Sequence, residues 1–87
     1  MEFITESEVK SLVGQPCRAP NGKLIEITAV NLIGEVFPIY KAVFKYLEEA
    51  PQGSIGMGYC AVDLLIPTTE KHHQLVETWR DRVNEDI

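Results

Sequence analysis

The side chains best suited to catalysis or metal binding are two cysteines, Cys17 and Cys60, and two adjacent histidines, His72 and His73. The histidines fall in a segment with helical periodicity, where neighbouring side chains point about 100° apart, so their rings do not converge on one metal ion. No Cys-x-x-Cys or His-x-x-x-His spacing supplies further ligands. The sequence therefore predicts no metal site and no cofactor.

Cysteine catalysis is a hypothesis that these residues leave open. It requires the last helix to lie beside a cysteine, with His72 or His73 as the base and Asp63 as the orienting carboxylate. Cys60, however, is flanked by apolar residues, and burial raises a thiol pKa and makes the thiol unreactive. Because no convergent set of polar residues is present, we predict no catalytic residue and rank an enzyme with a Cys/His pair third. A Cys17–Cys60 disulfide depends on whether the fold brings the two together.

The glycines and lysines argue against nucleotide or nucleic acid binding. Gly53, Gly56 and Gly58 precede a predicted strand, whereas the glycines of a dinucleotide site follow a strand and open a helix. Lys41 and Lys45 alternate with aromatic residues along a predicted strand, so the lysines and the rings lie on opposite faces. The net charge of −5 also repels nucleic acids and anionic membranes. We expect neither as a partner.

The length of 87 residues allows a single domain, residues 1–87, with one hydrophobic core. Such a short domain has little stability to spare and often gains some by self-association when no disulfide framework is present. The N-terminal residues lack the basic and apolar regions of a secretory signal, and no run approaches the ~18 apolar residues of a membrane span. We expect a cytoplasmic protein.

Local signals mark the first elements. Thr5-Glu6-Ser7-Glu8 is a capping box, and Gly14 followed by Pro16 ends a helix, which predicts a helix over 6–13. Asn21-Gly22 favours a type I′ hairpin turn between two antiparallel strands. The second strand is predicted over 23–33, with one face formed by Ile25, Ile27, Ala29 and Ile33.

The segment 37–47 fits two patterns. One is a helical stripe formed by Val36, Ile39, Tyr40, Val43, Phe44 and Leu47. We predict a strand instead, because aromatic residues at even positions alternate with Lys41 and Lys45, and aromatic and β-branched residues favour a pleated surface. A glycine-containing loop over 48–58, a fourth strand over 59–66, a threonine cap and a closing helix over 70–84 follow.

The predicted fold is α+β. It comprises an N-terminal helix, an antiparallel meander sheet of three to four strands, either open or curled like a small barrel, and a C-terminal helix. Apolar residues exceed what one face of this sheet needs, because the third and fourth strands carry them on both faces. Either the helices cover the second face, or a second copy of the chain does.

We rank a non-enzymatic interaction or binding module first, acting as a small homo-oligomer and most simply a homodimer. The predicted interface residues are Ile39, Val43, Leu47, Tyr59 and Leu65. The second hypothesis is a domain that binds a small apolar or aromatic ligand between the sheet and the last helix. The residues predicted to line that pocket are Tyr40, Phe44, Tyr46 and Trp79.

Overall fold

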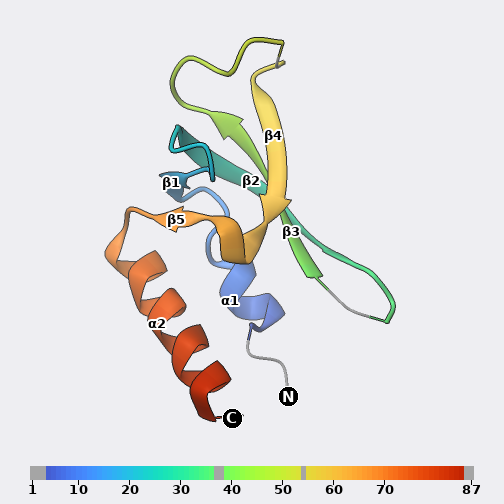
Figure 1. The fold of residues 1–87 in the computed structure, drawn as a ribbon, viewed down its shortest axis with the longest axis vertical. Coiled ribbons are helices and arrows are strands. Elements are labelled where there is room, and N and C mark those ends of the chain that lie inside the picture. The colour runs from blue at the N-terminus through green and yellow to red at the C-terminus, as the bar shows by residue number, and fades with distance from the viewer. Residues whose placement is uncertain (1–3, 37–38, 54, 86–87) are drawn as a thin grey trace.

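The computed structural model describes residues 4–36, 39–53 and 55–85, and it contains one antiparallel sheet flanked by two helices (Figure 1). The sheet has five strands in the order β4-β3-β2-β1-β5. The elements are α1 (Glu6–Lys10), β1 (Pro16–Arg18), β2 (Leu24–Ile33), β3 (Ile39–Tyr46), β4 (Met57–Ala61), the 3-10 helix η1 (Val62–Leu64), β5 (Ile66–Pro67) and α2 (Glu70–Glu85). The α+β class is confirmed, with one strand more than predicted.

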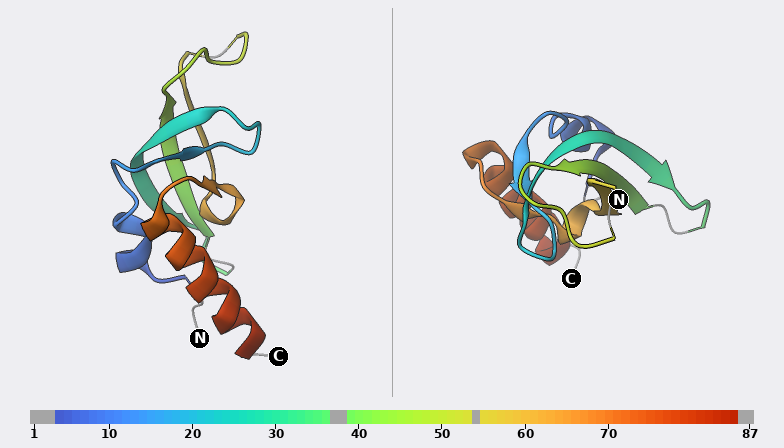
Figure 2. Two further views of the ribbon diagram at one scale, coloured as in Figure 1. Left: turned by 90° about the vertical axis from the view of Figure 1, so that its left-hand side faces the viewer. Right: turned by 90° about the horizontal axis from the view of Figure 1, so that it is seen from above.

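The sheet is strongly curled around the core, as the view from above shows (Figure 2). It is not closed, because β4 and β5 stand at its two ends. Both helices lie toward the same end of the molecule, opposite the loop that joins β3 and β4 (Figure 1). The core consists of Val9, Leu12, Cys17, Ala19, Ile25, Ile27, Ala42, Phe44, Val62, Leu65 and Trp79.

The capping box of α1 is confirmed, but the helix is shorter than predicted. Thr5 Oγ1 accepts a hydrogen bond from the Glu8 amide at 3.3 Å, and Glu8 Oε1 accepts one from the Thr5 amide at 3.0 Å. The helix ends at Lys10, and turns lead to Gly14, which has a φ of 85°. The Gly14 amide donates to the Ile27 carbonyl at 2.8 Å. The chain therefore attaches to β2 before another helical turn forms.

The turn between β1 and β2 is not the predicted type I′. Such a turn needs positive φ at both Asn21 and Gly22, and only Gly22 has it. Instead the Gly22 amide donates to the Ala19 carbonyl at 2.8 Å, which closes a β-turn with Pro20 at its second position. Pro20 explains the difference, because its ring presets the φ that this position requires.

A β-bulge at Thr28 divides β2. The register with β3 shifts between Ile27 and Ala29, so Thr28 is an extra residue in this strand. Ile27 is buried, but beyond the bulge Val30 rather than Ala29 packs against the core, and Ile33 is exposed. The predicted face of Ile25, Ile27, Ala29 and Ile33 is therefore wrong after residue 27.

β3 is a strand, and the helical alternative is excluded for residues 39–46. Ala42 and Phe44 are buried on its inner side, whereas Lys45 is exposed. This alternation confirms the period-two pattern. Phe37 and Pro38, which the predicted strand included, lie outside the described residues.

The strand predicted over 59–66 is in fact two short strands separated by η1. β4 pairs with β3, whereas β5 pairs with β1 at the other end of the sheet. The 3-10 turn redirects the chain and buries Val62 and Leu65, while Leu64 stays exposed. The prediction of one strand over 59–66 is therefore wrong, because Val62 is buried whereas Leu64 and Ile66 are exposed.

α2 begins with the predicted threonine cap, since Thr69 Oγ1 accepts a hydrogen bond from the His72 amide at 3.2 Å. The helix buries His72 and Trp79 and runs away from β5 (Figure 1). Among the described helices, none combines the length and apolar content that crossing a bilayer requires.

Candidate interaction surface

The convex side of β2, β3 and β4 carries a set of side chains that point away from the core, and we call it the outer face. Cross-strand pairing groups these side chains into rows, because residues that oppose each other in a sheet share a face. The rows are Glu26, Lys45 and Met57; Ala29, Val43 and Tyr59; Asn31, Lys41 and Ala61; and Ile33 with Ile39. The face is thus apolar along its central row and at the end near Ile33.

The two lysines of the outer face, Lys41 and Lys45, each contact a neighbouring side chain. Lys45 Nζ lies 3.3 Å from Glu26 Oε2, and Lys41 Nζ lies 5.1 Å from the centroid of the Tyr59 ring. The second distance is within the range of a cation–π contact. Tyr59 itself is 72% exposed. A large aromatic side chain is therefore displayed to solvent and held in place by a lysine from the neighbouring strand.

The far ends of β2 and β3 form a two-stranded arm beyond the rest of the sheet. The pairing of β4 with β3 stops at Lys41, and β1 pairs only with the first residues of β2 (Leu24–Glu26). The arm projects clear of the body (Figure 1). Its exposed apolar residues are Leu32, Ile33, Val36 and Ile39. A two-stranded ribbon is marginal by itself in water, so these side chains would gain stability from a partner.

Four of the five predicted interface residues are exposed or partly exposed, and three share the outer face. Ile39, Val43 and Tyr59 belong to that face, and Leu47 is exposed just after β3. Leu65 is a correction, since it is only 5% exposed and belongs to the core. The prediction placed it on a continuous strand, whereas η1 turns its side chain inward.

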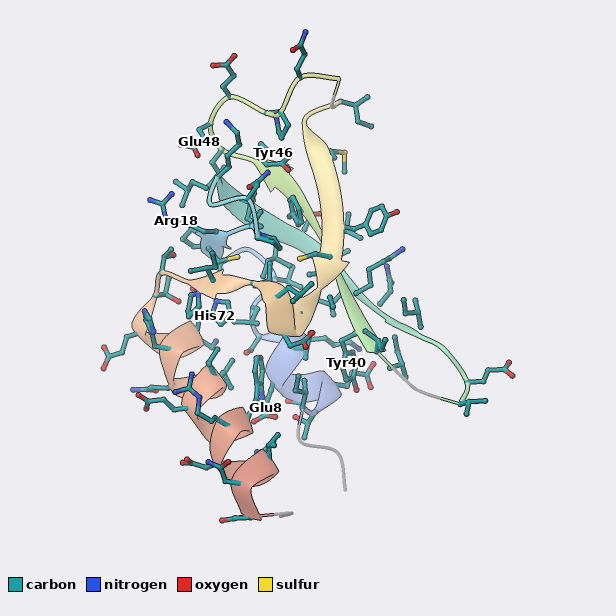
Figure 3. All side chains as sticks on the ribbon, viewed as in Figure 1. Glu8, Arg18, Tyr40, Tyr46, Glu48 and His72 are labelled. Carbon is teal, nitrogen blue, oxygen red and sulfur yellow. The ribbon has the colours of Figure 1, made fainter. Side chains whose placement is uncertain are left out.

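The four aromatic residues predicted to line a ligand pocket do not meet in one cavity. Phe44 and Trp79 are buried, and Phe44 packs edge-to-face on Tyr46 with ring centroids 5.5 Å apart. Tyr40 and Tyr46 lie at opposite ends of β3 (Figure 3). A groove of about 180 Å³ does lie beside Trp79, and it is lined by Val62, Asp63, Leu65, Val76, Trp79, Arg80 and Val83. None of the three strand aromatics lines this groove.

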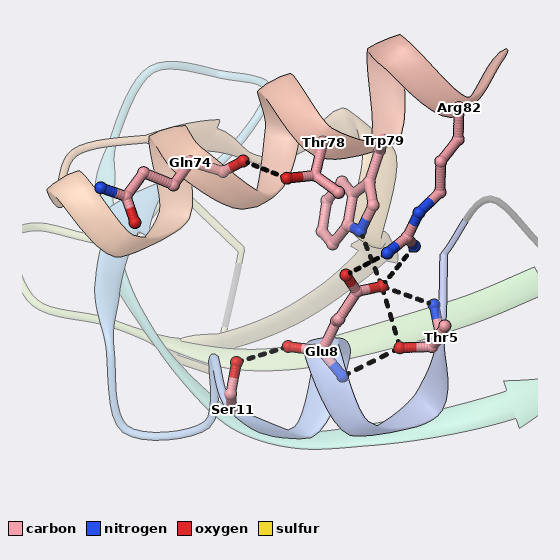
Figure 4. Close-up of polar contacts among 7 residues, drawn as sticks. All are labelled: Thr5, Glu8, Ser11, Gln74, Thr78, Trp79 and Arg82. Atoms are coloured by element: carbon pink, nitrogen blue, oxygen red, sulfur yellow. Dashed lines mark hydrogen bonds and ion pairs between the residues drawn. The ribbon is translucent and has the colours of Figure 1, made fainter. Parts of the chain in front are cut away.

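Trp79 is held by a polar cluster that joins the two helices (Figure 4). Its indole N–H donates to Glu8 Oε1 at 3.3 Å, and Arg82 donates to both oxygens of Glu8, at 2.7 and 3.0 Å. Burial alone would raise the pKa of Glu8, but hydrogen bonds from Arg82, Thr5 and Trp79 lower it to about 2. The cluster is a structural connection between α1 and α2, in which Glu8 accepts hydrogen bonds from both helices.

The cysteines and histidines do not form a reactive site. Burial and the nearby Cys60 raise the pKa of Cys17 to about 11, and burial and Asp63 raise the pKa of Cys60. Both thiols are free and stay protonated near neutral pH. Burial and His73 lower the pKa of His72, which lies at the start of α2 (Figure 3).

The buried His72 ring has neither nitrogen hydrogen-bonded within the described part of the chain. A histidine that acts as a general base must lie within hydrogen-bond reach of the group whose proton it takes, and a second group usually orients its ring. These two contacts identify a catalytic Cys/His pair. In the same described ranges, no three His, Cys, Asp or Glu side chains come together in a way that could hold a metal ion.

The arm and the open edge of β4 were not anticipated from the sequence. Leu32 lies in the predicted second strand and Val36 in the alternative helical stripe, and no residue type marks the point where a hairpin leaves its sheet. No family model, curated protein or solved structure matches this chain. The geometry therefore carries the functional argument alone.

Proposed function

We propose that this protein is a non-enzymatic interaction module that acts as a homodimer through its outer face. The observation that supports the proposal is the gathering of exposed apolar side chains on that face and on the adjoining arm. Water-exposed apolar patches of this kind are typical of binding surfaces, and a two-fold axis is the most common way for a small domain to bury one.

The chemistry of the described residues supports binding rather than catalysis. The groups with strongly shifted pKa values are Glu8, which is locked in a structural cluster, and Cys17, which is buried and protonated. An active site usually places such groups together in a cleft. The groove beside Trp79 instead has an apolar floor with Asp63 and Arg80 among its lining residues.

A cytoplasmic location is part of the same proposal. Both cysteines are free. Unpaired thiols persist in compartments kept reducing by thioredoxin and glutathione, whereas exported domains of this size commonly use cysteines as cross-links.

The direct test is the solution mass by light scattering over a concentration series. The wild-type chain should be a dimer, and the double variant Ile39→Lys, Val43→Lys should be a folded monomer, because two lysines would place like charges against each other across the axis. The matched control is Val13→Lys, since Val13 is 43% exposed, close to the 47% of Ile39, but lies outside the sheet. A monomeric wild-type protein at every concentration would refute the homodimer.

A second candidate function is the binding of a small apolar ligand in the groove beside Trp79. Its volume of about 180 Å³ is close to that of an engineered cavity of roughly 150 Å³ that binds benzene. We would titrate cyclohexanecarboxylate, whose ring suits the apolar floor and whose carboxylate suits Arg80, and follow Trp79 fluorescence. Saturable quenching that Val83→Glu abolishes would support this function, and a flat titration would exclude it for this probe.

A further inference from the structure

The two end strands of the sheet, β4 and β5, differ in how well they are protected from pairing with a further strand. β5 is only two residues long, contains Pro67 and leads directly into α2, which lies against it. Short length, proline and a covering helix are three of the devices by which proteins keep sheet edges from pairing. β4 is five residues long, regular in register, and contains no charged residue and no proline. The β5 edge is therefore protected, and among the described residues no strand pairs with the outer side of β4.

The backbone groups that β4 presents at its open edge follow from one hydrogen bond. The Tyr46 amide donates to the Gly56 carbonyl at 2.9 Å, so these residues form a hydrogen-bonded pair of the β3–β4 ladder. Such pairs alternate along an antiparallel ladder, so Gly58 and Cys60 direct their backbone groups toward β3. Met57 and Tyr59 direct their N–H and C=O groups outward. Ala61 directs its N–H outward, but its carbonyl accepts the first hydrogen bond of η1.

We infer that β4 pairs with β4 of a second copy, antiparallel, about a two-fold axis at Tyr59. This inference rests on the proposed homodimer, and it places the contact at the β4 edge, so that the two outer faces lie side by side instead of covering each other. In this register Met57 faces Ala61 of the second copy, and Tyr59 faces Tyr59 of the second copy. The two Tyr59 residues then exchange two hydrogen bonds, and each Ala61 N–H donates to the Met57 carbonyl of the second copy, which gives about four in total.

Side-chain size and charge fit the same register. On the inner side Gly58 would face Cys60 of the second copy, so small residues meet. Gly58 has no room for a side chain, because a Cβ there would lie 2.8 Å from the Phe44 ring. On the outer side the apolar row of Val43 and Tyr59 would continue into its own copy. β4 brings no charged residue to the axis, so two acidic chains can approach there without direct repulsion.

The lack of charge at this edge also favours a second copy over an unrelated strand. An edge that selects a different partner normally does so with charged side chains that reject wrong ones. β4 has no charged side chain, and in an antiparallel pair its residues are complementary to those of a second β4 strand. An isologous contact of this kind places one residue next to its own symmetry mate, and here that residue is Tyr59.

A cross-linking experiment tests the register. Cysteines replace Tyr59 or Met57 in a Cys60→Ser background, and the full chain is oxidised under dilute conditions. Tyr59→Cys should form a disulfide-linked dimer, because residues directly opposed in an antiparallel pair have Cα atoms about 5.5 Å apart or less. Met57→Cys is the matched control, since it is also exposed on β4 but would face Ala61 of the second copy rather than itself. Equal cross-linking of both variants would overturn the inference.

A backbone substitution tests strand pairing separately from side-chain packing. Tyr59→Pro removes an outward N–H and leaves the ladder with β3 intact, as proline is tolerated on edge strands in that orientation. Loss of two hydrogen bonds per dimer should raise the dimer Kd about thirtyfold or more. Tyr59→Thr keeps the N–H and should change the Kd less.

The outcomes separate this inference from the proposed function. A monomeric wild-type chain refutes both. A dimer that Ile39→Lys, Val43→Lys dissociates, but that Tyr59→Pro leaves intact, keeps the outer-face dimer and overturns strand pairing. A dimer that Tyr59→Pro dissociates, but that Ile39→Lys, Val43→Lys leaves intact, supports strand pairing and overturns the outer-face contact. If Tyr59→Pro fails to fold, the comparison of Tyr59→Cys with Met57→Cys still decides the question.

Discussion

The substitution Glu8→Gln should destabilise the domain more than any other single exchange of a charged side chain that we describe. Glu8 accepts hydrogen bonds from Thr5, Trp79 and Arg82, and the Arg82 contact joins residues 74 positions apart in the chain. Glutamine has nearly the same shape but offers only one acceptor oxygen and no charge. The variant therefore loses the ion pair that connects α1 to α2 while leaving the helices and the core in place.

The size of the effect follows from the pKa of Glu8. Lowering it from 4.5 to about 2 corresponds to about 3 kcal/mol of stability at neutral pH before screening. The Glu8 and Arg82 side chains are 18% and 29% exposed, so water screens part of this interaction. We expect a loss of about 2–3 kcal/mol, which for a chain of this length lowers the Tm by roughly 10 °C or more.

The assay is urea unfolding followed by Trp79 fluorescence, at one fixed protein concentration and at several pH values. The unfolded state binds a proton at Glu8 more readily than the folded state does, so the contribution is complete above pH 4.5 and is lost as the pH falls toward 2. The difference between wild type and Glu8→Gln should therefore be largest at pH 7 and shrink at pH 2. Glu6→Gln is the control, since the Glu6–Lys10 pair is exposed. A loss below 0.5 kcal/mol at pH 7, or a loss that does not depend on pH, would refute the reasoning.

Three further predictions concern the core. Gly58→Ala should cost about 1–3 kcal/mol in urea unfolding, because its Cβ would lie 2.8 and 2.9 Å from two Phe44 ring atoms; adding Phe44→Leu should cost less than the sum of the two single changes. Because burial, and to a lesser extent His73, lowers the pKa of His72, the unfolded state takes up a proton more readily and stability should fall as the pH drops below 6.5. His72→Leu should flatten this dependence, whereas His73→Gln should weaken it only in part. Cys17 should react with Ellman's reagent at pH 7.5 only after denaturation, because burial raises its pKa to about 11, and rapid reaction in the native state would contradict this.

The features that the sequence predicts well depend on residues close together in the chain. The capping box from Thr5 to Glu8, the threonine cap of α2 and the alternation along β3 each depend on neighbours within about four positions. Thr69 and Glu8 recognise adjacent backbone groups, so no other part of the fold has to be known. The α+β class follows from counting such elements.

The features that were missed depend on distant partners. The bulge at Thr28 fits the strand to β3, and it reverses which residues after it point inward. The turn at η1 carries the chain back to β1, a pairing between segments about 50 residues apart that leaves no periodic trace. The role of Arg82 was likewise not predictable, because its partner Glu8 lies 74 positions away in the chain. For the candidate surface, alternation identified Ile39, Val43 and Tyr59, whereas the burial of Leu65 required the turn to be known.

The protection of β5 limits how far strand addition can proceed. Of the two end strands of the sheet, only β4 is available for pairing, and joining two β4 strands uses that edge in both copies at once. No β4 edge then remains for a third chain, so assembly through β4 ends at two instead of growing into a filament. Removing Pro67 and the adjoining start of α2 would expose a second edge and convert a self-limiting contact into one that can propagate.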